Sequence, residues 1–224
     1  MESRITKGYA ILAVLYAFML VTSNIIAGKI FAVGGILLPA AVIIYPCVYI
    51  ISDLMTEVYG FRLSLLSIRL NTLCSLLFVG VVAVVLRLPY PDFWTNQGAF
   101  VGVFRTTPRI VLASLAGYYL GDWLNSATLS IMKVRVRRGG FPLRAILSTM
   151  LGQVADTGLF IFIAFFGTMP TGVLLQMMLA QYMVKVGYEA VCTPLTAYIV
   201  ARWKEWDGVD QYDVGNARSL YRIV

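Results

Sequence analysis

The sequence predicts an all-α membrane protein, a bundle of six transmembrane helices with both termini in the cytoplasm. Its 224 residues are 59% hydrophobic and only 13% charged, whereas a soluble domain is about 45–50% apolar and about 25% charged. Three uncharged runs, 8–28, 30–52 and 157–184, each reach the length of about 20 residues that a helix needs to cross a bilayer. Most basic residues lie in the short segments between apolar stretches.

The helix boundaries follow from the apolar stretches and from the turn residues between them. Gly60 suits a helix C-cap, Pro89 closes the third helix, and Pro108 and Pro142 suit first-turn positions. We expect transmembrane helices at 8–27, 36–58, 63–87, 108–132, 142–168 and 173–202. Residues 1–204 then form the six-helix transmembrane domain, and residues 205–224 form a polar cytoplasmic tail.

The orientation follows from the distribution of lysine and arginine. With six helices, both termini share one side of the membrane with the second-to-third and fourth-to-fifth connections. That side carries Arg4, Lys7, Arg62, Arg69, Lys133, Arg135, Arg137, Arg138, Arg144, Arg202 and Lys204. The other side carries Lys29, Arg87, Arg105 and Arg109. Because cytoplasmic loops are enriched in basic residues, both termini are predicted to be cytoplasmic.

Several function classes are excluded by composition. The net charge is +7, and the basic residues that produce it lie between the apolar spans, which indicates membrane topology rather than nucleic-acid binding. The chain has no histidine, the commonest metal ligand and general base. Gly121-Asp122 matches the end of the GxGD motif of intramembrane aspartyl proteases, but Tyr119 occupies the first glycine position. We therefore predict no enzyme, no metal site and no cofactor.

Ionisable residues inside the predicted helices are the candidates for function. Each costs about 2.5–3.5 kcal/mol at the bilayer centre on insertion scales, so each needs a partner or a water-filled cavity. They are Asp53, Glu57, Arg69, Arg109, Asp122, Asp156, Lys185 and Glu189. Asp53 and Glu57 are four residues apart and share a helix face, as do Gln153 and Asp156 at a spacing of three. Asp156 has no cation nearby in the sequence and needs a partner from another helix.

Structural alternatives stay open for several of these residues. Glu57 could simply end its helix at the headgroups, and Lys185 could neutralise Glu189 one turn away on the same helix. Asp122 could pair locally with Asn125 or Ser126. For Arg69 and Arg109, which lie near helix ends, we favour snorkelling to the membrane surface.

Small residues recur at a spacing of four in the fourth predicted helix, at Ala113, Gly117 and Gly121. This spacing permits two helices to approach closely. We expect the contact to lie within the chain, with a homodimer as the alternative.

Four polar motifs lie in order along the chain: 23–29 (SNIIAGK), 51–60 (ISDLMTEVYG), 152–157 (GQVADT) and 182–189 (YMVKVGYE), the last followed by Thr193-Pro194. Together they resemble the queuosine precursor transporters, also called vitamin uptake transporters. The resemblance implies six helices in a prokaryotic plasma membrane and uptake of a 7-deazaguanine base bearing a cyano or aminomethyl group. It also implies that the protein works without an ATPase.

A purine-like substrate needs a few placed polar groups in a mostly apolar pocket. One carboxylate accepts two adjacent N–H donors of a guanine-like edge, and Asp53 and Asp156 are the expected acceptors. The donors expected for the carbonyl of the base are Asn24, Gln153 and Lys185. The aromatic side chains expected to cover its face are Tyr45, Tyr49, Phe160 and Tyr188. Glu57 and Glu189 complete the predicted set of substrate-binding residues.

Two other functions compete with this one. The chain could be the substrate-capture subunit of an energy-coupling-factor importer, in which case the helix with Ala13 and Ala17 would dock a partner subunit. It could also be a membrane-embedded assembly factor whose only contacts are with other proteins and membrane lipid. That second alternative leaves the carboxylates of the second and fifth predicted helices unexplained.

Overall fold

The computed structural model describes residues 5–26, 29–33, 36–104, 108–135, 140–167 and 170–212. The helices are α1 (Lys7–Ile26), α2 (Tyr45–Tyr59), α3 (Phe61–Val85), α4 (Gln97–Phe104), α5 (Pro108–Arg135), α6 (Gly140–Phe165) and α7 (Thr171–Asp207). A short hairpin, β1 (Ile30–Val33) with β2 (Ile36–Pro39), and the 3₁₀ helix η1 (Ala40–Ile43) separate α1 from α2.

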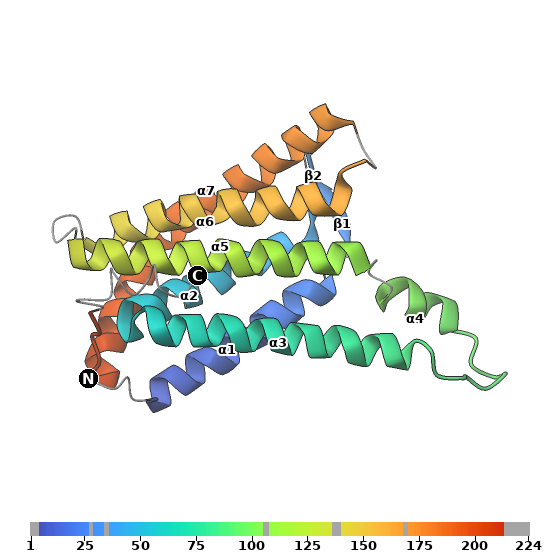
Figure 1. Ribbon diagram of the computed structural model, residues 1–224, viewed down its shortest axis with the longest axis horizontal. Helices are drawn as coiled ribbons and strands as arrows, with labels where there is room; N and C mark the ends of the chain where they lie inside the picture. Colours follow the sequence, from blue (N-terminus) through green and yellow to red (C-terminus); the bar gives the residue numbers. More distant parts are fainter. Residues whose placement is uncertain are drawn as a thin grey trace.

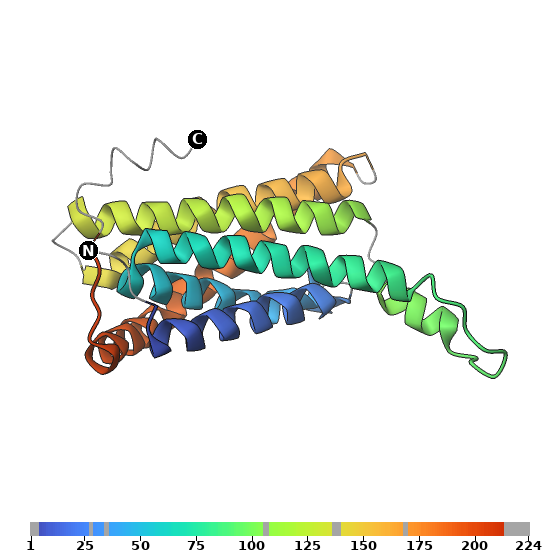
Figure 2. The ribbon, with the colours of Figure 1, turned by 60° about the horizontal axis from the view of Figure 1, so that its bottom comes forward.

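The long helices form one elongated bundle, with α3, α5 and α6 running along its length (Figure 1). One end of the bundle, here called the hairpin end, carries β1, β2 and α4 (Figures 1 and 2). At the opposite end, α1 begins and α7 ends, and a hydrogen bond joins Thr6 to Asp207 there. We call this the basic end, because Lys133, Arg144 and Lys204 lie there on α5, α6 and α7.

Three of the described helices, α1, α3 and α6, combine the length and hydropathy needed to cross a membrane. Five of the predicted helices agree with the structure to within a few residues, except that α7 runs on to Asp207. The helical fold class is therefore confirmed, with one short hairpin added.

The predicted helix at 36–58 is wrong in its first half. Residues 36–39 form strand β2, residues 40–43 form a 3₁₀ turn, and α2 begins only at Tyr45. Pro46 occupies the first turn of α2, where its missing N–H costs no hydrogen bond. With 15 residues, α2 is about 22 Å long, less than the ~30 Å hydrocarbon core of a bilayer.

The connection from α3 to α5 is also more structured than expected, since it contains the eight-residue helix α4. Phe93 and Trp94 lie in this connection and are 85% and 42% exposed. Gly60, by contrast, ends α2 as predicted. Its φ of 81° allows the chain to reverse directly into α3, which begins at the next residue.

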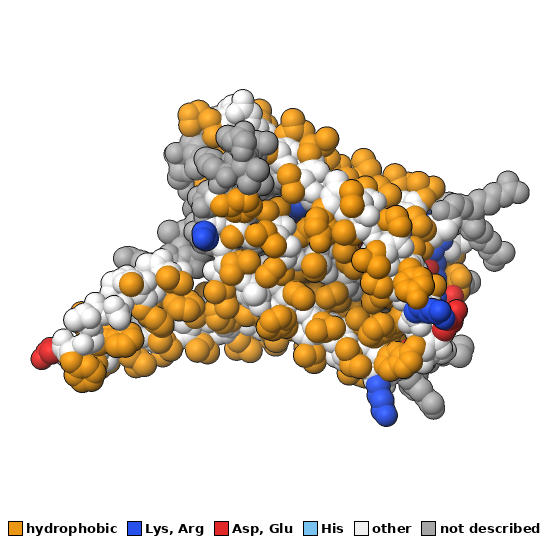
Figure 3. All heavy atoms as spheres, turned by 180° about the vertical axis from the view of Figure 1, so that it is seen from behind, with side chains coloured by type: hydrophobic (Ala, Val, Ile, Leu, Met, Phe, Trp, Pro, Cys, Tyr) orange, Lys and Arg blue, Asp and Glu red, His pale blue; other side chains and the backbone are white. Residues whose placement is uncertain are grey.

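The surface of the bundle between its two ends is mainly apolar (Figure 3). On α3, Leu70, Leu73 and Leu77 are 48–60% exposed. Basic side chains gather at the basic end, on the right in this view. An apolar belt with charged ends is the surface that a bilayer requires.

Helices α5 and α6 pack closely because glycines face each other. A Cβ atom added at Gly121 would lie 2.5 Å from the Cβ of Asp156 and 2.9 Å from the carbonyl oxygen of Gly152. At Gly152, an added Cβ would lie 2.7 Å from the carbonyl oxygen of Gly121. The small residues of the fourth predicted helix therefore serve contact within the chain, which places the Asp156 backbone directly against α5.

This packing predicts the effect of single methyl groups. Gly121→Ala should lower the melting temperature of the detergent-purified protein, because the new methyl meets backbone rather than a flexible side chain. Gly158→Ala is the matched control, since an added Cβ there meets nothing within 4 Å. The control should be neutral or slightly stabilising, as alanine is the better helix former. Equal melting temperatures for the two variants would contradict the close packing.

Candidate substrate-binding site

Polar side chains follow one face of α2 through the interior of the bundle. Tyr45, Tyr49, Asp53 and Glu57 are each four residues apart, so they project from the same side of the helix. All four are buried, with no more than 8% of the residue exposed. Helices α5, α6 and α7 face this row with polar residues of their own.

An ion pair between α6 and α7 lies beside the tyrosines of α2. The Lys185 Nζ is 2.6 Å from Asp156 Oδ2, and both side chains are at least 90% buried. The same ammonium lies 4.5 Å from the centroid of the Tyr45 ring. The Tyr49 hydroxyl faces Asp156 closely enough to interact with its carboxylate. A donor, an acceptor and an aromatic ring thus meet in a buried place.

This ion pair decides two questions that the sequence left open. Asp156 does take its partner from another helix, as predicted. The alternative pair within α7 is not formed, because Lys185 is bound to Asp156 instead of to Glu189. Glu189 is 1% exposed, and neither of its carboxylate oxygens has a hydrogen-bond partner among the described residues.

Asp53 and Asp122 each form one hydrogen bond across the α2–α5 contact. Asn125 Nδ2 donates to Asp53 Oδ1 at 2.6 Å, and Ser52 Oγ donates to Asp122 Oδ1 at 2.6 Å. Asp122 therefore bonds to a hydroxyl of α2 and not to Asn125 or Ser126, its predicted local partners. The second oxygen of each carboxylate has no partner in the described part of the chain.

Glu57 belongs to a separate charge cluster at the basic end. Its Oε1 lies 2.8 Å from Arg144 Nη2, 2.9 Å from Lys204 Nζ and 3.9 Å from Lys133 Nζ. Glu57 is 2% exposed, so it does not simply end a helix at the membrane surface. Four helices, α2, α5, α6 and α7, are tied together by this one carboxylate. Its geometry is that of a structural anchor.

The segment after α7 packs onto the same cluster. Asp210 Oδ1 accepts from Lys133 at 2.6 Å and lies 2.9 Å from Lys204, and the Gln211 backbone N–H donates to the Val58 carbonyl. Partial burial alone would raise the pKa of Asp210, but the two lysines outweigh it and hold the pKa below its usual value. Residues 208–212 of the predicted tail therefore contact the helices. The rest of that tail, 213–224, lies outside the described residues.

A family described as "Putative vitamin uptake transporter" matches residues 39–199. This chain belongs to that family. One curated relative, "Probable queuosine precursor transporter" of Bacillus subtilis (strain 168), is 26% identical over 191 residues, or 82% of this chain and 80% of the relative. No solved structure matches the chain. Family membership and the apolar helices together make it a multi-pass membrane protein of the transporter class.

The matched region of this transporter contains every predicted site residue except Asn24. The structure brings Tyr49, Asp156 and Lys185 together, with Gln153 one turn from Asp156 on α6 and 1% exposed. Asp53 and Glu189 form a second group, close enough to repel each other. Glu57 lies apart from both groups, at the basic end.

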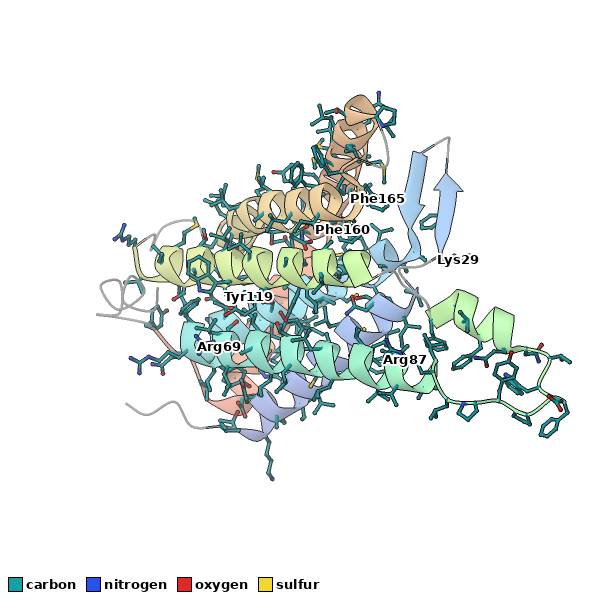
Figure 4. All side chains as sticks on the ribbon, turned by 45° about the vertical axis from the view of Figure 1, so that its right-hand side comes forward. Lys29, Arg69, Arg87, Tyr119, Phe160 and Phe165 are labelled. Atoms are coloured by element: carbon teal, nitrogen blue, oxygen red, sulfur yellow. The ribbon has the colours of Figure 1, made fainter. Side chains whose placement is uncertain are left out.

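The other three predicted residues have contacts of their own. Asn24 accepts a hydrogen bond from Ser114 at 3.2 Å, between α1 and α5. Phe160 is half-buried, and its ring stacks edge-on against Phe165 on the same helix (Figure 4). Tyr188 is 39% exposed and contacts Cys47 and Cys192. As substrate contacts, all three remain predictions.

Sequence reasoning missed the partners of Glu57. Lys133, Arg144 and Lys204 were counted only as basic residues of the cytoplasmic side. A signal was present, since each lies within about two turns of a predicted helix end, level with the end of α2. Arg69 and Arg87 lie toward opposite ends of α3, and Lys29 lies by the hairpin (Figure 4). Arg69 is exposed, as expected for a snorkelling side chain.

Proposed function

We propose that this transporter imports queuosine precursors, 7-deazaguanine bases that carry a cyano or aminomethyl group. The relative from Bacillus subtilis supports the substrate class. The observation that carries the proposal in the structure is the buried Asp156–Lys185 pair beside Tyr45 and Tyr49. Buried ionisable groups inside a membrane bundle are costly and mark substrate pathways.

The ion pair matches the polar edge of a guanine-like base. That edge presents a carbonyl acceptor beside two N–H donors. Lys185 donates to the carbonyl, and Asp156 accepts from the two N–H groups, as carboxylates do in bidentate pairs. The Tyr45 ring covers the face of the base, and the Tyr49 hydroxyl beside Asp156 supplies one more hydrogen bond. This arrangement uses neither Asp53 nor Glu189.

Ligand binding tests this proposal directly. At a concentration about one hundred times the dissociation constant, a ligand stabilises the folded state by about 2.7 kcal/mol. Purified protein should therefore melt at a higher temperature with 7-cyano-7-deazaguanine than with adenine, which lacks the carbonyl and the paired donors. Equal shifts with both bases, or no shift, would contradict the assigned site.

We infer six membrane crossings with the basic end in the cytoplasm. Helix α1 runs from the basic end to the hairpin end, and the hairpin with α2 returns to the basic end (Figure 1). Helices α3 and α6 then run toward the hairpin end, and α5 and α7 run back toward the basic end. Both ends of the chain then lie on the cytoplasmic side, where basic residues gather. A phosphatase fused after Val224 should be inactive in cells, because this reporter folds only outside the cytoplasm. An active fusion would reverse the orientation.

The alternative, a substrate-capture subunit of an energy-coupling-factor importer, predicts a stable complex with an ATPase. Purification of the tagged chain from its native membranes decides between the two. Uptake by the chain alone in liposomes favours the proposal, and uptake that needs the co-purified ATPase favours the alternative.

A further inference from the structure

The interior of the bundle carries more negative than positive charge. Between the basic end and the hairpin end, the described residues of α2, α5, α6 and α7 include four buried carboxylates and one buried ammonium, Lys185. The carboxylates are Asp53, Asp122, Asp156 and Glu189. Lys185 neutralises Asp156, so four minus one leaves three negative charges if every group is ionised. Such an interior has to bind protons or cations, because a buried charge needs a partner.

Glu189 is the least satisfied of these groups. Both of its oxygens are buried and lack a hydrogen-bond partner among the described residues, and one oxygen of Asp53 does too. The two carboxylates lie close enough to repel each other. In this setting the neutral, protonated form of a carboxyl group is tolerated, whereas its charged form is strongly disfavoured.

We propose that Glu189, together with Asp53, binds a proton that crosses the membrane with the imported base. This inference rests on the proposed function and names the proton gradient as the energy source that drives uptake. The proton comes from water outside and forms an O–H bond on the Glu189–Asp53 pair. That bond breaks when the site opens to the cytoplasm, the proton passes to water there, and the carboxylate is restored.

The groups around Glu189 favour this role. On the helices packed against α7, the charged groups are Lys7 of α1, Asp53 and Glu57 of α2, and Arg144 and Asp156 of α6, while α7 itself contributes Lys185, Arg202, Lys204, Glu205 and Asp207. The tyrosines on these helices are Tyr9 and Tyr16 of α1, Tyr45, Tyr49 and Tyr59 of α2, and Tyr182, Tyr188 and Tyr198 of α7. Lys7 is exposed at the start of α1, and the other four cations are each within 4 Å of another carboxylate, which leaves Glu189 without a cation among the described residues.

A proton fits the pair better than a metal ion does. No group of three or more acidic, cysteine or histidine side chains in the described ranges could hold a metal ion. Lys185 precedes Glu189 by one helical turn on the same face of α7. Binding of the base to Lys185 therefore changes the electric field at Glu189, which links the two ligands.

A chain of hydroxyl groups leads from Asp122 toward the basic end. Ser52 bonds to Asp122 at 2.6 Å and lies 3.4 Å from Ser126. Ser126 in turn lies 3.1 Å from Thr56 and 3.0 Å from Ser64, in the first turn of α3. Hydroxyl groups both donate and accept hydrogen bonds, so this chain is suited to pass a proton.

The test uses the full-length protein in liposomes and two assays of labelled 7-cyano-7-deazaguanine. The first is exchange against unlabelled base inside, which needs no proton gradient. The second is accumulation driven by an acidic exterior. With one proton moved per base, a difference of about one pH unit supports up to about tenfold accumulation of an uncharged base. A protonophore should abolish accumulation but leave exchange intact.

Glu189→Gln should keep exchange and lose accumulation, because the amide cannot release a proton. Glu205→Gln is the matched control, since this carboxylate is 67% exposed and paired with Arg202, and it should keep both activities. Should the Glu189 variant fail to fold, wild-type protein alone still tests the proposal. Adding base outside should then acidify the interior of the liposomes, as reported by a trapped pH-sensitive dye.

The possible failures are distinguishable. Exchange without any effect of a proton gradient overturns the proton site and leaves the proposed substrate standing. Accumulation driven by a sodium gradient instead also overturns it. Absence of exchange in folded protein overturns the proposed function itself.

Discussion

Lys185→Met should abolish uptake and strongly destabilise the protein. The substitution leaves Asp156 buried without its cation, and breaking a buried ion pair in this way costs about 3–5 kcal/mol. The variant should express poorly and melt well below wild type. Lys29→Met is the matched control, because Lys29 is exposed at the hairpin end and should tolerate the change.

The double variant Lys185→Met with Asp156→Asn separates stability from function. Removing both charges eliminates the stranded carboxylate, so most of the lost stability should return. Uptake should remain absent, because the base has lost both its donor and its acceptor. If the double variant transported at the wild-type rate, the Asp156–Lys185 pair would have a structural role only and would not bind the base.

Glu57→Gln should have the second largest effect, and on stability in particular. Three cations converge on Glu57 Oε1, and the amide leaves Arg144 without its carboxylate and Asp210 alone to offset the two lysines. We expect a loss of about 3–5 kcal/mol, measured as a lower melting temperature and lower yield.

The exposed pair of Glu205 and Arg202 supplies the comparison for Glu57. Exposed ion pairs contribute about 0–1 kcal/mol, so Glu205→Gln should melt close to wild type. If Glu57→Gln melted as high as Glu205→Gln, the cluster would not anchor the four helices. Retained exchange by the residual folded Glu57→Gln protein would agree with our placing Glu57 outside the base site.

The sequence predicted the long helices well because their apolar runs are long and their ends are marked by proline or glycine. It failed at 30–43, where an uncharged apolar run is equally compatible with strands and with a helix. The hairpin signal was present, since two four-residue apolar runs flank Gly34-Gly35, a pairing that favours a two-residue turn. A hydropathy profile alone does not detect this signal, because strands and helices can be equally apolar.

The candidate site was predicted in part for a similar reason. Helical spacing placed Asp53 and Glu57 on one face of α2, and hydropathy identified the ionisable residues of α6 and α7. It could not show that Lys185 reaches across to Asp156, because that choice depends on how α6 and α7 pack. Helical spacing also could not assign different roles to Glu57 and the deeper Asp53. Which of the two carboxylates pairs with cations depends on where α5, α6 and α7 end in space, and this is known only from the structure.

Exchange of labelled 7-cyano-7-deazaguanine by the purified chain in liposomes tests the central claim most directly. Exchange should saturate, be competed by unlabelled 7-aminomethyl-7-deazaguanine but not by adenine, and be lost in the stable Lys185→Met with Asp156→Asn protein. Folded wild-type protein that exchanges no more base than protein-free liposomes would contradict the account.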